Sequence, residues 1–209
     1  MRRSIALAGF VIGLVALIIE VFLIVALSMD AGRGFFGSLV YTFSFFTILT
    51  NLGLVLIYLG AIVRGQRWLI FFRKPHTRAM AAAAIALTGR YYHFVLSGMW
   101  HQEGLLYWCN IALHYVAPLL YLVWFAVWNR SGTLKWQAVL TLLAYPLIYL
   151  VYVLIRGALT GEYPYEMFDA AARGYASVAI SSGFLLVVFI ILNAIAVAID
   201  RSLLAGKRH

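Results

Sequence analysis

The sequence predicts an all-α integral membrane protein, a bundle of six transmembrane helices with both termini in the cytoplasm. Three observations support this prediction. Of the 209 residues, 65% are hydrophobic and only 11% are charged, and the mean hydropathy is +0.94, which is far from the balance of a soluble domain. Apolar runs long enough to cross a bilayer recur along the chain. Basic residues concentrate in the connections that an even number of spans places on one side.

The predicted spans are residues 4–29, 35–63, 79–98, 105–128, 135–156 and 178–200, which together form one domain, residues 1–209. The first run is too long for the core of a signal peptide, so we expect it to be retained as a span. The second exceeds the roughly 20 residues that a bilayer requires, and tilt would absorb the excess. No connection is long enough to bury a core of its own.

The formal net charge of +9 indicates the orientation of the chain in the membrane more than it indicates a binding partner. Basic residues occupy the N-terminus, the 64–78 connection, the 129–135 link and the tail, all on one side of a six-span bundle. Positively charged connections face the cytoplasm, which gives the predicted orientation. No repeat of basic and aromatic residues suggests nucleic-acid binding, so the expected partners are membrane lipids. The sequence does not indicate an oligomeric state.

The fourth span carries a polar motif inside an apolar run. Asn110 and His114 are four residues apart and share a helical face. Pro118 lacks the N–H that would bond the His114 carbonyl, so we expect a kink and a free carbonyl there. In the second span Ser44, Thr47 and Asn51 share a face near mid-membrane. Both sets could be polar contacts that join helices, or parts of a wet cavity.

Depth along the helices favours a cavity. At about 1.5 Å per residue, most polar groups within the spans fall in the outer half of the membrane: Glu20, Arg90, His93, Asn110, His114, Tyr145, Tyr149 and Arg156. Scattered contacts between helices would not gather in one leaflet, whereas an outward-opening pocket would require it. We expect Glu20 to pair with Arg90 or Arg156, because an unpaired carboxylate at this depth costs about 2.5 kcal/mol or more.

A pairing of Thr47 with His114 would allow nucleophilic catalysis. A threonine hydroxyl becomes a nucleophile when a base takes its proton, and neutral histidine is suited to that role near pH 7. No buried aspartate could orient the imidazole, so Asn110, Tyr145 or Glu20 would do so. The single cysteine, Cys109, excludes an intramolecular disulfide and a cysteine-based metal site.

Two segments resemble the androgen-induced-gene family of integral-membrane threonine hydrolases and its bacterial relatives. They are Phe-Thr-Ile-Leu-Thr-Asn at 46–51 and Trp-Cys-Asn-Ile-Ala-Leu-His at 108–114. Tyr145-Pro146, Arg156 and Tyr163-Pro164-Tyr165 are similar to features of the bacterial branch. The resemblance implies that Thr47 is the nucleophile and His114 its partner. Animal members cleave fatty acid esters of hydroxy fatty acids. Their Asn-His-x-x-His motif is matched only at Asn110 and at its second histidine, His114.

The resulting hypothesis is an intramembrane lipid ester hydrolase in a bacterial inner membrane, acting on fatty acyl esters of the hydroxy-fatty-acid type. Thr47 and His114 would be catalytic, and the supporting or substrate-binding residues would be Asn51, Asn110, Glu20, Arg90, His93, Tyr145, Tyr149 and Arg156. An acyl chain would enter laterally, and Arg156 or Arg90 would hold a carboxylate head. We expect no metal and no cofactor.

Two alternatives remain open at this point. The same outward-facing pocket could serve a non-enzymatic binder or transporter of lipids or small amphiphiles, since Pro118 and Pro146 interrupt helices at cavity depth. A haem held by His93 and His114 is a further alternative. The set His93, His101, Glu103 and His114 matches no recognised zinc-ligand spacing.

Overall fold

The computed structural model describes residues 1–98 and 102–205, and every regular element in these ranges is helical. Two of the elements, η2 and η3, are π-helical, and η1 and η4 are 3₁₀ turns. In chain order the elements are α1 (Arg2–Asp30), α2 (Phe35–Thr42), α3 (Phe46–Ile62), η1 (Arg67–Leu69), α4 (Ile70–Arg73), α5 (Pro75–Tyr91), η2 (Tyr92–Leu96), α6 (Gly104–Ile111), η3 (Ala112–Val116), α7 (Ala117–Trp128), α8 (Ala138–Thr141), α9 (Ala144–Thr160), η4 (Glu166–Phe168), α10 (Ala170–Arg173) and α11 (Tyr175–Ala205).

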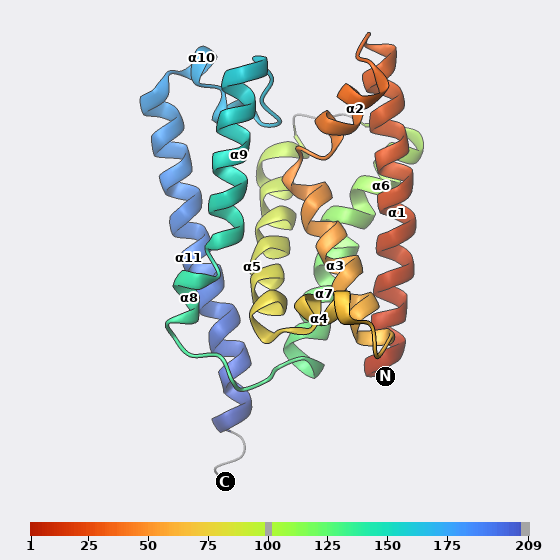
Figure 1. Ribbon diagram of the computed structural model, residues 1–209, viewed down its shortest axis with the longest axis vertical. Helices are drawn as coiled ribbons and strands as arrows, with labels where there is room; N and C mark the ends of the chain where they lie inside the picture. Colours follow the sequence, from red (N-terminus) through yellow and green to blue (C-terminus); the bar gives the residue numbers. More distant parts are fainter. Residues whose placement is uncertain (99–101, 206–209) are drawn as a thin grey trace.

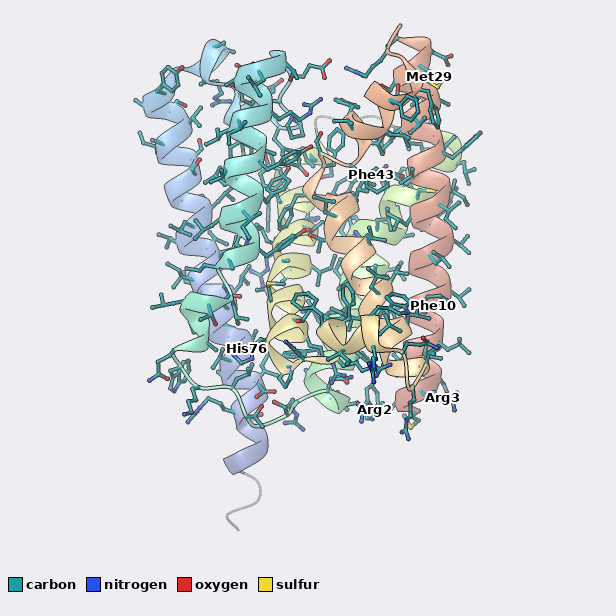
Figure 2. The ribbon with its side chains drawn as sticks, in the orientation of Figure 1. Arg2, Arg3, Phe10, Met29, Phe43 and His76 are labelled. Atoms are coloured by element: carbon teal, nitrogen blue, oxygen red, sulfur yellow. The ribbon has the colours of Figure 1, made fainter. Side chains whose placement is uncertain are left out.

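The helices form one bundle with α5 at its centre (Figure 1). α1 packs along α3 on one flank, and α5 packs against α7 on one side and α11 on another. The start of α1 and the end of α11 lie at the same end of the bundle, and the α1–α2 turn and α10 lie at the other (Figure 1). We call these the terminal end and the opposite end. Figure 2 shows Arg2, Arg3 and His76 at the terminal end and Met29 at the opposite end.

Within residues 1–98 and 102–205, four helices are long and apolar enough to cross a membrane: Arg2–Asp30, Gly104–Trp128, Ala138–Thr160 and Tyr175–Ser202. The bent pair of α2 and α3 makes a fifth if it counts as one span. This is fewer than the six predicted spans. The difference lies in the predicted span 79–98, which is represented by α5, a 17-residue helix, and η2. Alanines fill much of α5, and the consecutive residues 81–85 are all buried, so this helix packs inside the bundle.

Large apolar side chains cover the outside of the bundle. Phe22 on α1, Leu119 on α7 and Phe184 on α11 are 71%, 66% and 67% exposed. Many other large apolar side chains on these helices are exposed as well. A monomer in water rarely shows contiguous apolar surface on this scale. The exposed faces therefore suit contact with lipid, as expected of an integral membrane protein.

The second predicted span is broken at residues 43–45, where α2 and α3 meet at 76°. Neither proline nor glycine occurs at the break. Instead Thr42 Oγ1 donates to the Ser38 carbonyl at 2.8 Å, and Ser44 Oγ donates to the Tyr41 carbonyl at 2.6 Å. Such bonds from side chain to backbone compete with the helical pattern. α3 therefore begins inside the bundle, at Phe46.

The terminal end holds an aromatic core and a buried carboxylate. Tyr58, Tyr121 and Trp124 lie within 5.8 Å of one another, measured between ring centroids. Asp200 on α11 accepts hydrogen bonds from the Ser131 N–H and hydroxyl and from the Leu134 N–H. This carboxylate fixes the loop between α7 and α8 against the last helix.

Candidate functional site

Thr47 and His114, which the sequence predicts to be partners, lie in contact. Thr47 is the second residue of α3, and its Oγ1 is 3.3 Å from Nε2 of His114 on η3. His114 is only 4% exposed, and its ring stacks on Tyr92 with 4.0 Å between the centroids. The separation is at the upper edge of hydrogen-bond distance. The fold thus brings a hydroxyl and an imidazole together from helices distant in the sequence.

The backbone orients the imidazole. His114 Nδ1 lies 3.0 Å from the carbonyl oxygen of Asn110. A carbonyl only accepts, so Nδ1 carries the proton in the neutral ring and Nε2 is left as the acceptor. Nε2 can therefore accept the proton of Thr47. Asn110, one of the three residues predicted to orient the ring, does so through its main chain.

A π-helical turn places His114. Within η3 the Ala117 N–H bonds the Ala112 carbonyl, five residues back, and π turns are frequent at functional sites. In this register the N–H that Pro118 lacks would have served Leu113. The Leu113 carbonyl instead accepts from Asn51 Nδ2 at 3.4 Å. The free carbonyl that was predicted at His114 is thus displaced by one residue, and a widened turn replaces a simple kink.

Asn51 and Asn110 connect the elements of the site. Asn51 Nδ2 also donates to the Thr47 carbonyl at 3.0 Å, so one amide joins α3 to η3. Asn110 Nδ2 donates to the Leu106 carbonyl at 2.9 Å, to Gln102, and to Glu20 Oε1 at 3.5 Å. The second oxygen of Glu20 is buried and has no hydrogen-bond partner among the described residues.

The expected ion pairs of Glu20 are wrong. Within the described part of the chain, Arg156 pairs with Glu162 at 2.7 Å, and Arg33 reaches the same carboxylate at 2.6 Å. Arg90 is exposed. Both arginine partners of Glu162 lie at the opposite end, where the carboxylate is more accessible to water than Glu20 is. Desolvation therefore favours an ion pair there over one at mid-membrane.

Three further predicted residues lie beside or outside the Thr47–His114 pair. Tyr149 donates to the Ser44 carbonyl at 2.9 Å and thereby stabilises the break before α3. The Tyr145 hydroxyl is 3.0 Å from Thr50 Oγ1, and both residues line a separate cavity that His114 does not line. His93 is exposed, and its Nδ1 lies 3.1 Å from the Tyr115 hydroxyl.

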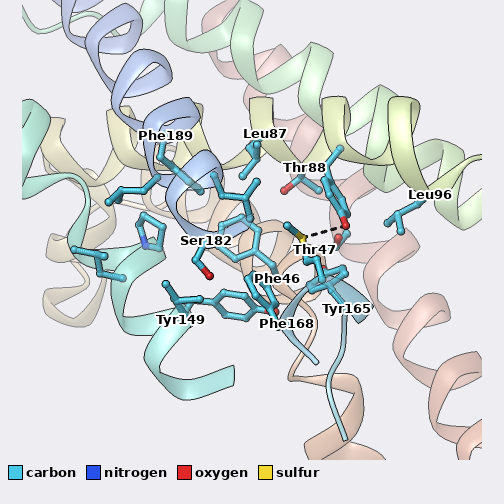
Figure 3. Close-up of a pocket in the computed structure, with 17 residues that line it drawn as sticks. Phe46, Thr47, Leu87, Thr88, Leu96, Tyr149, Tyr165, Phe168, Ser182 and Phe189 are labelled. Carbon is cyan, nitrogen blue, oxygen red and sulfur yellow. Dashed lines mark hydrogen bonds between the residues drawn. The ribbon is translucent and has the colours of Figure 1, made fainter. Parts of the chain in front are cut away.

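Two cavities meet at Thr47. The polar cavity, of about 400 Å³, is lined by Glu20, Arg33, Tyr41, Gln102, Asn110 and His114, among others. The apolar cavity, of about 80 Å³, lies among Phe46, Leu87, Tyr149, Leu186 and Phe189 (Figure 3). Only Thr47, Leu96 and Tyr165 line both cavities among the described residues. The hydroxyl of Thr47 therefore lies at the boundary between a polar and an apolar compartment.

Residues that the sequence analysis did not place in the site complete it. Tyr165 comes from the cap, which we define as residues 161–174 between α9 and α11, and Figure 3 draws it next to Thr47. Burial raises the pKa of the Tyr165 phenol to about 12, although the Thr47 hydroxyl and the N–H groups of Thr47 and Phe46 act in the opposite direction. The sequence signal for this residue was the Tyr163-Pro164-Tyr165 segment, which resembles a feature of the bacterial branch.

The described residues contain no group of three His, Cys, Asp or Glu side chains that could hold a metal ion. His101, one of the residues considered for zinc, lies outside the described residues. The haem alternative does not fit the geometry, because His114 is engaged by Thr47 and Asn110 while His93 contacts Tyr115.

Comparison of the chain with protein-family models, with curated proteins and with solved structures gives no match in any of the three.

Proposed function

We propose that this protein is an intramembrane lipid ester hydrolase with Thr47 as nucleophile and His114 as general base. The observation that carries the proposal is the ordered chain from the Asn110 carbonyl through His114 to the Thr47 hydroxyl, with separations of 3.0 and 3.3 Å. A base held in the right tautomer beside a hydroxyl is the arrangement that nucleophilic catalysis requires.

The chemistry follows in two steps. Thr47 Oγ1 attacks the ester carbonyl while His114 Nε2 takes the hydroxyl proton. The bond to the leaving alcohol breaks as Nε2 returns that proton, which leaves an acyl-threonine. Water, deprotonated by Nε2, then attacks the acyl group, and the fatty acid leaves as Thr47 regains its proton. No cofactor or metal enters this sequence.

The broken second span supports stabilisation of the tetrahedral intermediate. The N–H groups in the first turn of a helix have no intrahelical partner, and no side-chain hydrogen bond from Phe45 caps α3 within the described chain. Thr47 and Ile48, in this first turn, line the polar cavity. In our proposal these N–H groups and the positive end of the helix dipole would stabilise the negative charge that develops on the carbonyl oxygen.

The two cavities suggest the shape of the substrate. An ester whose carbonyl reaches Thr47 can extend one arm among the apolar residues around Phe189 and another into the polar cavity, where Arg33 lies. A fatty acyl ester of the hydroxy-fatty-acid type, as the family resemblance implies, has an apolar arm and a carboxylate. Arg33, which lines the polar cavity, replaces both Arg156 and Arg90 in our proposal as the partner of that carboxylate.

We also propose the topology. α5 with η2 would be the sixth span, and the terminal end, which carries Arg2 and Arg3 (Figure 2), would face the cytoplasm of a bacterial inner membrane. The cap and the polar cavity would then open outward. Cysteines introduced one at a time at Arg3 and Asp169, in a Cys109→Ala background, test this by labelling with a membrane-impermeant maleimide, because only the second should react in intact cells.

A fluorophosphonate probe tests the proposed nucleophile. The purified protein should be labelled, Thr47→Ala should not, and His114→Gln should react about 10²- to 10⁴-fold more slowly. Thr50→Ala is the matched control, because Thr50 lies one turn away on α3 and contacts Tyr145 instead of His114. Equal labelling of the wild type and Thr47→Ala would contradict the proposal.

A non-enzymatic binder of amphiphiles is the second candidate. The polar cavity has the volume of a typical ligand site. Glu20 lines this cavity, and one of its carboxylate oxygens has no hydrogen-bond partner among the described residues. Purified protein that retains an intact ester, with the same retention in His114→Ala, would favour this candidate over hydrolysis.

A further inference from the structure

Tyr165 lines both cavities, as Thr47 does. Its ring is fixed by edge-to-face contacts with Phe45, Tyr91 and Phe168, with centroid separations of 6.0, 5.8 and 6.2 Å. Phe45 directly precedes α3, and Phe168 lies in the cap. The phenol ring is therefore held both by the residue that precedes α3 and by the cap.

Of the three residues shared by the two cavities, only Thr47 and Tyr165 have polar side chains. Leu96 contributes methyl groups alone. The other tyrosines around the apolar cavity are already engaged, since Tyr91 donates to Met167 Sδ at 3.3 Å and Tyr149 donates to the Ser44 carbonyl. The Tyr165 phenol is thus the hydroxyl that accompanies Thr47 at the junction.

We propose that Tyr165 is a further catalytic residue, whose hydroxyl donates a hydrogen bond to the ester carbonyl oxygen as negative charge develops on it. This inference rests on the proposed hydrolase function. Tyr165 would act together with the first-turn N–H groups of α3, which lie beside the phenol. It keeps its proton throughout, because its pKa of about 12 leaves the phenol neutral at physiological pH. Since the cap carries the residue, a properly placed cap is needed for a complete site.

The test compares Tyr165→Phe with Tyr163→Phe. Tyr163 lies two residues away in the cap and packs against Gly157, outside both cavities. With 4-nitrophenyl octanoate as substrate, Tyr165→Phe should lose about 10²-fold in kcat, the effect of removing one oxyanion donor, with KM within about threefold of the wild type. Tyr163→Phe should keep wild-type values. Fluorophosphonate labelling of Tyr165→Phe should slow in parallel, since the phosphoryl oxygen occupies the same position.

The outcomes separate this inference from the function on which it rests. If Thr47→Ala abolishes labelling while Tyr165→Phe retains the wild-type kcat, the hydrolase stands and the role of Tyr165 is wrong. A rise in KM at unchanged kcat would also overturn it, because that result indicates a packing role. If Thr47→Ala is labelled like the wild type, the hydrolase itself fails.

Discussion

Gly89→Ala should disable the site from a position that contributes no side chain to it. Gly89, on α5, faces the η3 turn, and an added Cβ would lie 2.9 Å from the His114 carbonyl oxygen and 3.4 Å from Pro118 Cγ. The atoms that the Cβ would meet belong to the backbone and to a proline ring, so no flexible group can move away. The helices must therefore separate.

The size of the shift follows from the contact. Ordinary van der Waals contact begins at 3.4 Å, so η3 would move by about 0.5 Å. Such overpacking typically costs about 1–3 kcal/mol of stability. The hydroxyl–imidazole separation is already 3.3 Å, and a further half ångström takes it out of hydrogen-bond range. Misplacement on this scale can lower the rate by about 10- to 100-fold.

Thermal unfolding in detergent and the rate of fluorophosphonate labelling measure the two effects on the same sample. Gly53→Ala, on α3, is the matched control, because its Cβ would meet nothing within 4 Å. That variant should be as stable as the wild type or about 0.5–1 kcal/mol more stable, since glycine is unfavourable within a helix. Wild-type melting and labelling in Gly89→Ala would refute the argument.

Two further predictions concern stability at the ends of the bundle. The hydrogen bond from Arg33 and, after it, that from Arg156 lower the pKa of the Glu162 carboxyl. The stabilisation is therefore present above the ordinary carboxyl pKa and is lost as pH falls through the lowered one. The melting temperature of the wild type should fall across that range, whereas Glu162→Gln should melt lower at pH 7 and change less on acidification. Asp200→Ala should cost about 1–3 kcal/mol, measured by thermal unfolding, because it leaves buried N–H groups of the α7–α8 loop without an acceptor; Ser202→Ala is its control, and equal melting of the two variants would contradict this.

The Thr47–His114 contact could be anticipated because the depth of a residue in the membrane depends mainly on its position along its helix. Once the spans and their directions are assigned, the rise per residue places polar groups at comparable heights. Helical spacing then selects which of them share a face, and this is how Asn51 and Asn110 were associated with the pair. Neither argument gives the direction in which a helical face points. Arg90 and His93 therefore have the predicted depth but lie outside the cavities.

The break between α2 and α3 could not be anticipated from hydropathy, because residues 35–63 form one apolar run. The break depends on bonds that exist only in the folded bundle. Thr42 and Ser44 donate to carbonyl groups of α2, and the hydroxyl of Tyr149, on the distant α9, donates to the Ser44 carbonyl. Hydrogen bonds from short polar side chains to the backbone are compatible with a continuous helix or with a broken one. Which of the two forms depends on the tertiary partner of the free backbone groups.

The break between α2 and α3 matters for the proposed chemistry. In a continuous helix the N–H groups of Thr47 and Ile48 would bond carbonyls four residues earlier, and Thr47 would offer only its hydroxyl. Because the chain starts a new helix at Phe46, Thr47 provides a hydroxyl beside a base and lies in a first turn whose N–H groups have no intrahelical partner. The cap then brings the phenol of Tyr165 to this point. In the proposed mechanism, the break that hydropathy misses is thus the feature that would let a pair of polar side chains stabilise an oxyanion.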